Sequence, residues 1–141
     1  MTLRCARWRS TVPYASAVVV LAASLVGCVS FGPLSTIAVS DVKSLAGSWK
    51  GVVYGYGGAS RTDVDMTIRE DGSYLVAARQ GIGTSHGEGK ILISEGRLII
   101  EGQRGEGVAT LMSNPAGKRV MLIEMTLFDN SHLSARLWPS P

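Results

Sequence analysis

Short stretches of alternating apolar and polar residues, separated by turn sequences, fill the chain beyond residue 45. The alternation is clearest over residues 62–70, where Val64, Met66 and Ile68 share one face. Residues 119–127 repeat this pattern, with Met121, Ile123, Met125 and Leu127 on one side. The pattern predicts strands over residues 48–55, 62–70, 73–80, 88–94, 97–102, 107–113, 119–127 and 132–138.

The connections between these segments contain residues that favour tight turns, as in Asp71-Gly72 and Glu95-Gly96. Every connection is seven residues or fewer. A parallel crossover needs about a dozen, so successive strands should be antiparallel neighbours. Closing such a sheet buries its apolar face and removes its edges. We therefore expect an all-β domain, an antiparallel up-and-down eight-stranded small barrel or half-barrel.

The amino-terminal residues follow a different pattern, typical of a secretory signal. Basic residues come first, at Arg4, Arg7 and Arg9, and an apolar run follows from Val12 to Val26. The run ends in Leu25-Val26-Gly27-Cys28, which resembles the lipobox of bacterial lipoproteins. This resemblance implies that the Cys28 thiol is lipidated, with fatty acids such as palmitate, and that the chain is cut before it. An uncleaved anchor helix and cleavage near Ala23 are the alternatives.

The lipobox divides the chain into a signal peptide over 1–27, a lipidated tether over 28–44 and a barrel domain over 45–141. Residue 29 is valine, not the aspartate that resembles an inner-membrane retention signal, which favours the outer membrane facing the periplasm. A flexible tether would reach roughly 20–24 Å from the bilayer. It is unusually apolar for a spacer, because it contains Phe31, Leu34, Ile37 and Val39.

Cysteine content and charge exclude several kinds of site. Cys5 would be removed with the signal, and Cys28 alone can form neither an intramolecular disulfide nor a cysteine-based metal site. Three of the 14 Lys and Arg residues lie in the signal, leaving 11 against 11 Asp and Glu. The sequence pI of about 9.1 therefore mostly reflects the export signal. We expect no nucleic-acid partner.

Gly47-Ser48-Trp49 at the start of the first strand resembles the Gly-x-Trp signature of lipocalin and calycin barrels. The resemblance implies that Trp49 packs across one barrel end beneath an Arg of the last strand, here Arg136, in a cation–π contact. The stretch is also similar to the first strand of avidins and of small periplasmic metalloprotease inhibitors. Four further aromatic residues could line a small pocket: Tyr54, Tyr56, Tyr74 and Trp138.

The sequence contains only weak signals for other binding or catalytic sites. We expect no catalytic residues, cofactor or metal. Residues 81–89 superficially resemble a phosphate loop, but no helix is predicted after them, so they indicate a flexible hairpin loop. His86 and His132 lack metal-ligand spacing to another ligand residue. Asp63 and Asp65 lie on one strand face, where alternating carboxylates are ordinary solvated groups.

The outward faces of the predicted strands carry an apolar stripe of Leu92, Ile99, Val120 and Leu122. Such patches usually contact something. Either the apolar tether folds back over the stripe or an envelope protein partner binds it.

Together these features favour a non-enzymatic, membrane-anchored extracytoplasmic lipoprotein with a binding or envelope-structural role. A protease-inhibitor-like barrel and a carrier of a small hydrophobic ligand are the alternatives. The first alternative requires a free amino-terminal segment, and the second requires a cavity.

Overall fold

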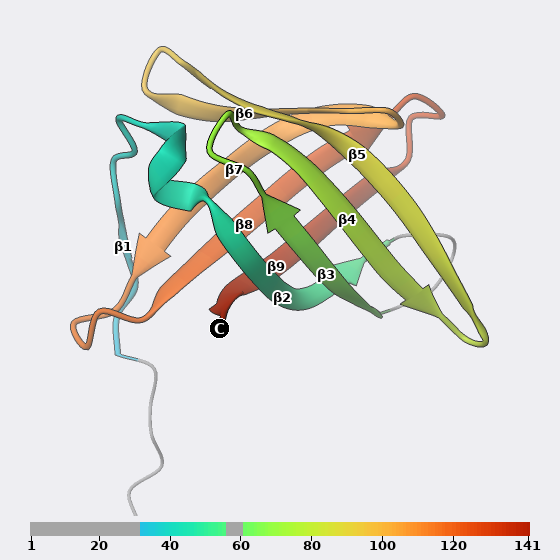
Figure 1. Cartoon of the computed structure of the whole chain (residues 1–141), viewed down its shortest axis with the longest axis horizontal. Coiled ribbons are helices and arrows are strands. Elements are labelled where there is room, and N and C mark those ends of the chain that lie inside the picture. The colour runs from blue at the N-terminus through green and yellow to red at the C-terminus, as the bar shows by residue number, and fades with distance from the viewer. Residues whose placement is uncertain (1–31, 56–60) are drawn as a thin grey trace, which may run out of the picture. The chain divides into compact units, whose positions relative to one another are not determined.

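The computed structural model describes residues 32–55 and 61–141, which form an all-β barrel (Figure 1). The predicted signal, Cys28, Phe31 and Tyr56 lie outside these residues. Two short elements come first, β1 (Ser35–Thr36) and the 3-10 helix η1 (Val42–Leu45). The barrel strands are β2 (Gly47–Tyr54), β3 (Thr62–Ile68), β4 (Ser73–Gln80), β5 (Gly83–Ser94), β6 (Arg97–Gly102), β7 (Gly105–Ser113), β8 (Arg119–Leu127) and β9 (His132–Ser140).

The barrel is closed. Each strand from β2 to β9 pairs antiparallel with the next one along the chain, and β9 also pairs with β2. This confirms the expected antiparallel eight-stranded barrel and excludes the half-barrel. The alternation in β3 is also confirmed, because Val64, Met66 and Ile68 are buried inside the barrel while Asp63 is exposed.

The glycine-rich segment 81–89 differs from expectation. Only residues 81 and 82 form a turn, and β5 pairs with β4 from Gly83 onward. Two of its glycines, Gly87 and Gly89, are needed for space. A Cβ on Gly87 would lie 3.1 Å from Val76 Cγ1, and one on Gly89 would lie 2.1 Å from the carbonyl oxygen of Glu101. Glycine thus lets neighbouring strands and inward side chains approach closely.

Residues 32–44 also differ from expectation, because they are not a free tether. β1 pairs with the carboxyl-terminal half of β7, and the Ile37 amide donates to the carbonyl oxygen of Leu111 over 2.8 Å. Val39 belongs to the core and is 9% exposed. This apolar segment therefore packs back onto the barrel, as one reading of the sequence expected, but it enters the core rather than covering the outer stripe.

The two barrel ends are built differently. At one end η1 lies beside the β3–β4 turn, where a Cβ on Gly72 would meet Val42 Cγ1 at 2.9 Å. Figure 1 shows the β5–β6 and β7–β8 turns on the same side of the barrel as η1, the left side of the view. We call this the closed end, and the opposite end, with the β4–β5, β6–β7 and β8–β9 turns, the open end. Within the described part of the chain, no helix has the length and apolar character to span a bilayer.

Candidate functional site

Trp49 closes one end of the barrel, as the Gly-x-Trp resemblance implied. Its side chain points inward from β2 and is 2% exposed. The indole Nε1 donates to the carbonyl oxygen of Leu45 over 2.8 Å, and Leu45 itself is fully buried. The end of η1 and the start of β2 are thereby fixed across the barrel end.

The cation over Trp49 comes from Arg119, not from Arg136. The Arg119 guanidinium lies 5.7 Å from the ring centroid and donates to the carbonyl oxygen of Ser44 over 3.2 Å. Strand register explains the difference. Pro139 is the β9 residue opposite Trp49, while Arg136 lies opposite Val52 and is exposed on the outer face. The first residue of β8 supplies the contact that the resemblance assigned to the last strand.

A cavity of about 120 Å³ occupies the other half of the barrel. Its walls are apolar side chains that point inward from all sides, including Val64 and Met66 from β3, Val76 and Ala78 from β4, Ile123 and Met125 from β8, and Ala135 from β9. Its rim contains Ser85, His86, Glu88, Gln103 and Arg104. The barrel interior therefore offers an apolar site whose polar groups lie near the turns of the open end.

Among residues 32–55 and 61–141, Tyr74 is the one Phe, Tyr or Trp residue that lines this cavity. Its side chain points inward from β4 and is 6% exposed. A Cβ on Gly89 would lie 2.5 Å from the Tyr74 hydroxyl oxygen, and one on Gly102 would lie 2.7 Å from it. The phenol thus extends over two glycines on neighbouring strands. Burial raises the pKa of the Tyr74 phenol above its usual value of 10.0.

The other aromatic candidates lie elsewhere. Tyr54 points outward from β2, is 45% exposed and lines an open groove of mixed polar and apolar side chains beside β7, β8 and β9. Trp138 lies opposite Lys50 on the outer face of β9. Of the aromatic residues suggested for a pocket, the described structure brings only Tyr74 to the cavity. The alternation of residues along β4 could indicate that Tyr74 points inward. The cavity itself depends on packing between strands distant in sequence, which the alternation does not show.

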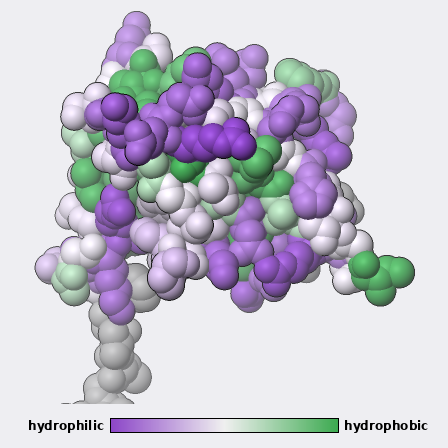
Figure 2. Space-filling view, viewed as in Figure 1, coloured by the Kyte–Doolittle hydropathy of each residue, from purple (hydrophilic) through white to green (hydrophobic). Residues whose placement is uncertain are grey.

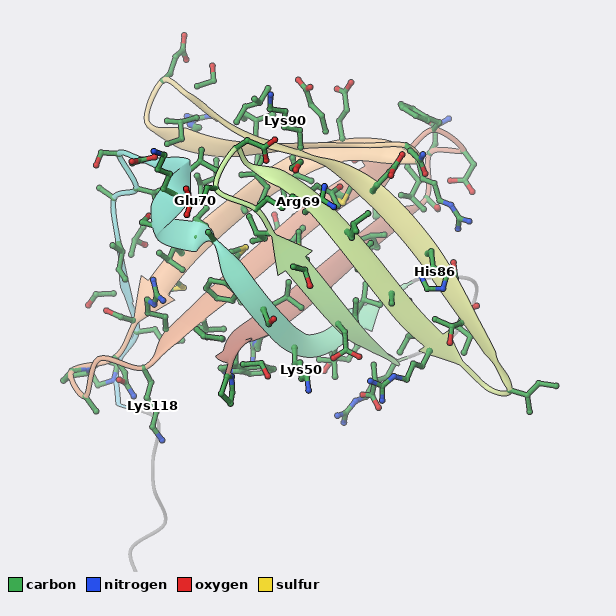
Figure 3. All side chains as sticks on the ribbon, in the orientation of Figure 1. Lys50, Arg69, Glu70, His86, Lys90 and Lys118 are labelled. Carbon is green, nitrogen blue, oxygen red and sulfur yellow. The ribbon has the colours of Figure 1, made fainter. Side chains whose placement is uncertain are left out.

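Polar groups at the rim connect β5 to the β6–β7 turn through hydrogen bonds. The Gln103 side chain donates to Glu88 Oε1 over 2.9 Å, and the Gln103 amide donates to the Glu88 carbonyl oxygen over 3.1 Å. His86, labelled on β5 in Figure 3, is exposed at this rim. Two apolar side chains project from the same end, Ile82 at 112% exposure and Phe128 at 70%.

The remaining titratable candidates form ordinary surface contacts. His132 Nδ1 lies 3.2 Å from Thr126 Oγ1. Asp65 forms an ion pair with Arg79 and lies 4.0 Å from Lys50. In residues 32–55 and 61–141, no three His, Cys, Asp or Glu side chains are grouped as a metal site.

The outer stripe is only partly present as expected. Leu92 and Ile99 are paired neighbours on β5 and β6, and both are half-buried. Val108, which sequence reasoning missed, lies next to Ile99 on β7 and is 40% exposed. Val120 is 2% exposed, so it cannot present a surface to a partner.

Leu122 lies one strand farther on and pairs with Thr110 rather than continuing the row of Leu92. Glu124 is the β8 residue next to Val108, so a carboxylate ends that row. Figure 2 shows apolar side chains interspersed with polar ones on the face it presents. The stripe is therefore a short apolar row with a separate apolar position beside it.

Comparisons with protein-family models, with curated proteins and with solved structures found no match.

Proposed function

We propose that this chain is a lipid-anchored envelope protein without enzymatic activity, whose barrel binds a small, largely apolar molecule. The observation that carries the proposal is the cavity of about 120 Å³ inside a barrel closed at one end by Trp49. Ligand sites are typically concave and mostly apolar, with a few polar groups. The cavity fits this description better than any other feature of the described residues.

The cavity size limits the ligand. An engineered protein cavity of about 150 Å³ lined by apolar side chains binds benzene. The volume of about 120 Å³ here is of the same order, and the space continues to the rim at Gln103 and Arg104. A molecule with one small ring or a short branched chain would fill it, and a longer molecule would extend past the rim.

A lipid on Cys28 would also orient the site. Gly32 lies four positions after Cys28, and an extended chain spans at most about 3.6 Å per residue, so the anchor lies within roughly 14 Å of Gly32. A Cβ on Gly32 would lie 3.4 Å from Pro115 in the β7–β8 turn, at the closed end. The closed end would then face the bilayer, and the cavity would open away from it, into the periplasm if the anchor is in the outer membrane.

Incorporation of labelled palmitate tests the anchor. In a bacterial host we expect label in the wild-type protein and in Cys5→Ser, because Cys5 would be removed with the signal. Cys28→Ser should carry none. Label that persists in Cys28→Ser would overturn the assignment of the lipidation site.

The protease-inhibitor alternative receives less support. It needs an amino-terminal segment that can enter a protease cleft. Here Ser35 and Thr36 pair with β7, Val39 packs in the core and Leu45 is fully buried. Releasing them would expose this apolar surface to water.

Mass spectrometry of the gently extracted protein tests the binding function. We expect a retained small molecule in the wild type and its loss in Ala78→Leu, because Ala78 lines the cavity and the larger side chain would fill it. Ala77→Leu is the matched control, since Ala77 precedes it on β4 and lies opposite Asp65, which points outward. Ala135→Leu fills the cavity from β9 should Ala78→Leu fail to fold. A wild type without a retained molecule, or a folded filled variant that keeps it, would refute the proposal.

A further inference from the structure

We propose that the ligand of the cavity is neutral and carries one oxygen-containing polar group, and that the hydroxyl of Tyr74 binds this group. This inference rests on the proposed binding function. It identifies the chemical class of the ligand and the residue that selects it.

The Tyr74 hydroxyl is an unpaired polar group that reaches the cavity. Among the described residues it has no hydrogen-bond partner, although the side chain is 6% exposed. No fully enclosed side-chain nitrogen or oxygen in this part of the chain lacks a partner. The unpaired oxygen is therefore open to the cavity rather than sealed in the wall. A ligand with a complementary group would bond this accessible hydroxyl in place of water, while its apolar part leaves water for the cavity wall.

The surroundings of Tyr74 hold the phenol in place. Any side chain on Gly89 or Gly102 would collide with the Tyr74 hydroxyl, at 2.5 and 2.7 Å respectively. The Met125 methyl group also lies close to the Cβ position of Gly102, at 3.5 Å. Two neighbouring strands thus leave a slot for the ring, and the hydroxyl is presented against an apolar wall.

The wall composition argues for a neutral ligand. The charged side chains that line the cavity, Glu88 and Arg104, are exposed at the rim, and Arg104 already has another interaction. A carboxylate or ammonium group beside Tyr74 would lose its hydration among Met66, Val76 and Ile123 without an opposite charge. Because burial raises the pKa of Tyr74, the phenol stays protonated at neutral pH and can donate. A hydroxyl, ether or carbonyl oxygen can accept this bond.

Phenol and toluene form a matched pair of probes, because they have the same ring and differ by a hydroxyl in place of a methyl group. The full-length chain, in lipid nanodiscs if it is purified with the membrane, is labelled with ¹³C at its methionine methyl groups. Met66 and Met125 line the cavity, and Met112 on β7 does not, so their signals separate cavity binding from other effects. Tyr74→Phe removes only the hydroxyl, and Tyr54→Phe is the control outside the cavity.

We expect both probes to shift the Met66 and Met125 signals while Met112 stays unchanged. Tyr74→Phe should weaken phenol binding relative to toluene binding by roughly 3- to 10-fold, the range of one neutral hydrogen bond. Tyr54→Phe should leave the ratio unchanged. If both probes bind but Tyr74→Phe leaves the ratio unchanged, the role of Tyr74 is refuted while the binding function stands. If neither probe shifts the cavity signals, the binding function is refuted and this inference with it.

Discussion

The indole of Trp49 and the carbonyl oxygen of Leu45 form a 2.8 Å hydrogen bond between two residues that are almost completely buried. The bond spans one turn of chain, from the end of η1 to the beginning of β2. It satisfies a buried carbonyl group and a buried indole nitrogen at once, and the ring covers the barrel core. The closed end therefore depends on a local contact within the Gly-x-Trp segment.

Trp49→Phe should lower the free energy of unfolding by about 1–3 kcal/mol, because the Leu45 carbonyl oxygen would lose its donor and the smaller ring would leave a gap. Urea denaturation followed by circular dichroism measures the change. Trp138→Phe is the control, since Trp138 lies on the outer face opposite Lys50, and its effect should be smaller. Equal losses in the two variants would contradict this role of Trp49.

Arg119→Met should destabilise the protein by about 0.5–1 kcal/mol, because it removes the cation over Trp49 and keeps an apolar stem. Arg136→Met should change stability by less than about 0.5 kcal/mol, as expected of an exposed position. Repeating both substitutions in a Trp49→Phe background isolates the contact with the ring. A loss for Arg136→Met that disappears in that background would restore the assignment made from the lipocalin resemblance.

The strand order and most strand boundaries followed from the sequence because they depend on local information. Alternation fixed the inward faces of β3 and β8, and the short turns left only antiparallel neighbours. Arg119 was missed because the residue that lies over Trp49 depends on the register between strands distant in sequence. The sequence suggested a small pocket but could not establish the cavity, for a related reason, since the cavity volume is what remains after all inward side chains have packed.

Two segments were misjudged because their local composition indicates something different from their packing. The glycines of residues 81–89 are typical of a loop, yet Gly87 and Gly89 lie in β5 where larger side chains would collide. Residues 32–44 show no alternation and contain Gly32-Pro33, yet Val39 enters the core. In both segments the tertiary contacts decide the structure, not the local preference.

Gly89→Ala should destabilise the barrel by about 1–3 kcal/mol, the usual cost of forcing atoms into a packed interior. The new methyl group would lie 2.1 Å from the Glu101 carbonyl oxygen, so the β5–β6 pairing must shift. Gly83→Ala is the matched control on the same strand, because its Cβ would have the Gln80 carbonyl oxygen at 3.7 Å as its only close neighbour. Thermal unfolding measures both. A tolerated Gly89→Ala would contradict the packing explanation for these glycines.

Val39→Asp should destabilise the protein by several kcal/mol, because an unpaired carboxylate would be placed in the core. Leu34→Asp should have a small effect, since Leu34 is 38% exposed just before β1. Urea denaturation of both variants measures whether the segment before η1 belongs to the folded domain. If Val39→Asp unfolds like the wild type, residues 32–44 act as the tether that the sequence suggested.

Stability should fall in acid partly through Asp71 and Asp129, which occupy equivalent positions in the turns before Ser73 and Ser131. Each Ser hydroxyl donates to the Asp carboxylate, over 2.7 Å at Asp71 and 2.6 Å at Asp129, and each Ser amide donates over 2.9 Å. These bonds, the hydroxyl bond first, lower the pKa of both carboxyl groups below the usual value of 3.8. A pKa that is lower in the folded state stabilises the fold above the unfolded pKa, and this contribution is lost as the pH falls through the folded pKa.

We therefore expect the wild type to lose stability between about pH 5 and pH 2, and Asp71→Asn with Asp129→Asn to lose less, because an amide accepts the same bonds without titrating. Ser73→Ala with Ser131→Ala should show an intermediate dependence, since the backbone donors remain. Urea midpoints measured across this pH range in the three proteins provide the comparison. Parallel curves for the wild type and the double Asn variant would show that these two turns do not contribute to acid sensitivity.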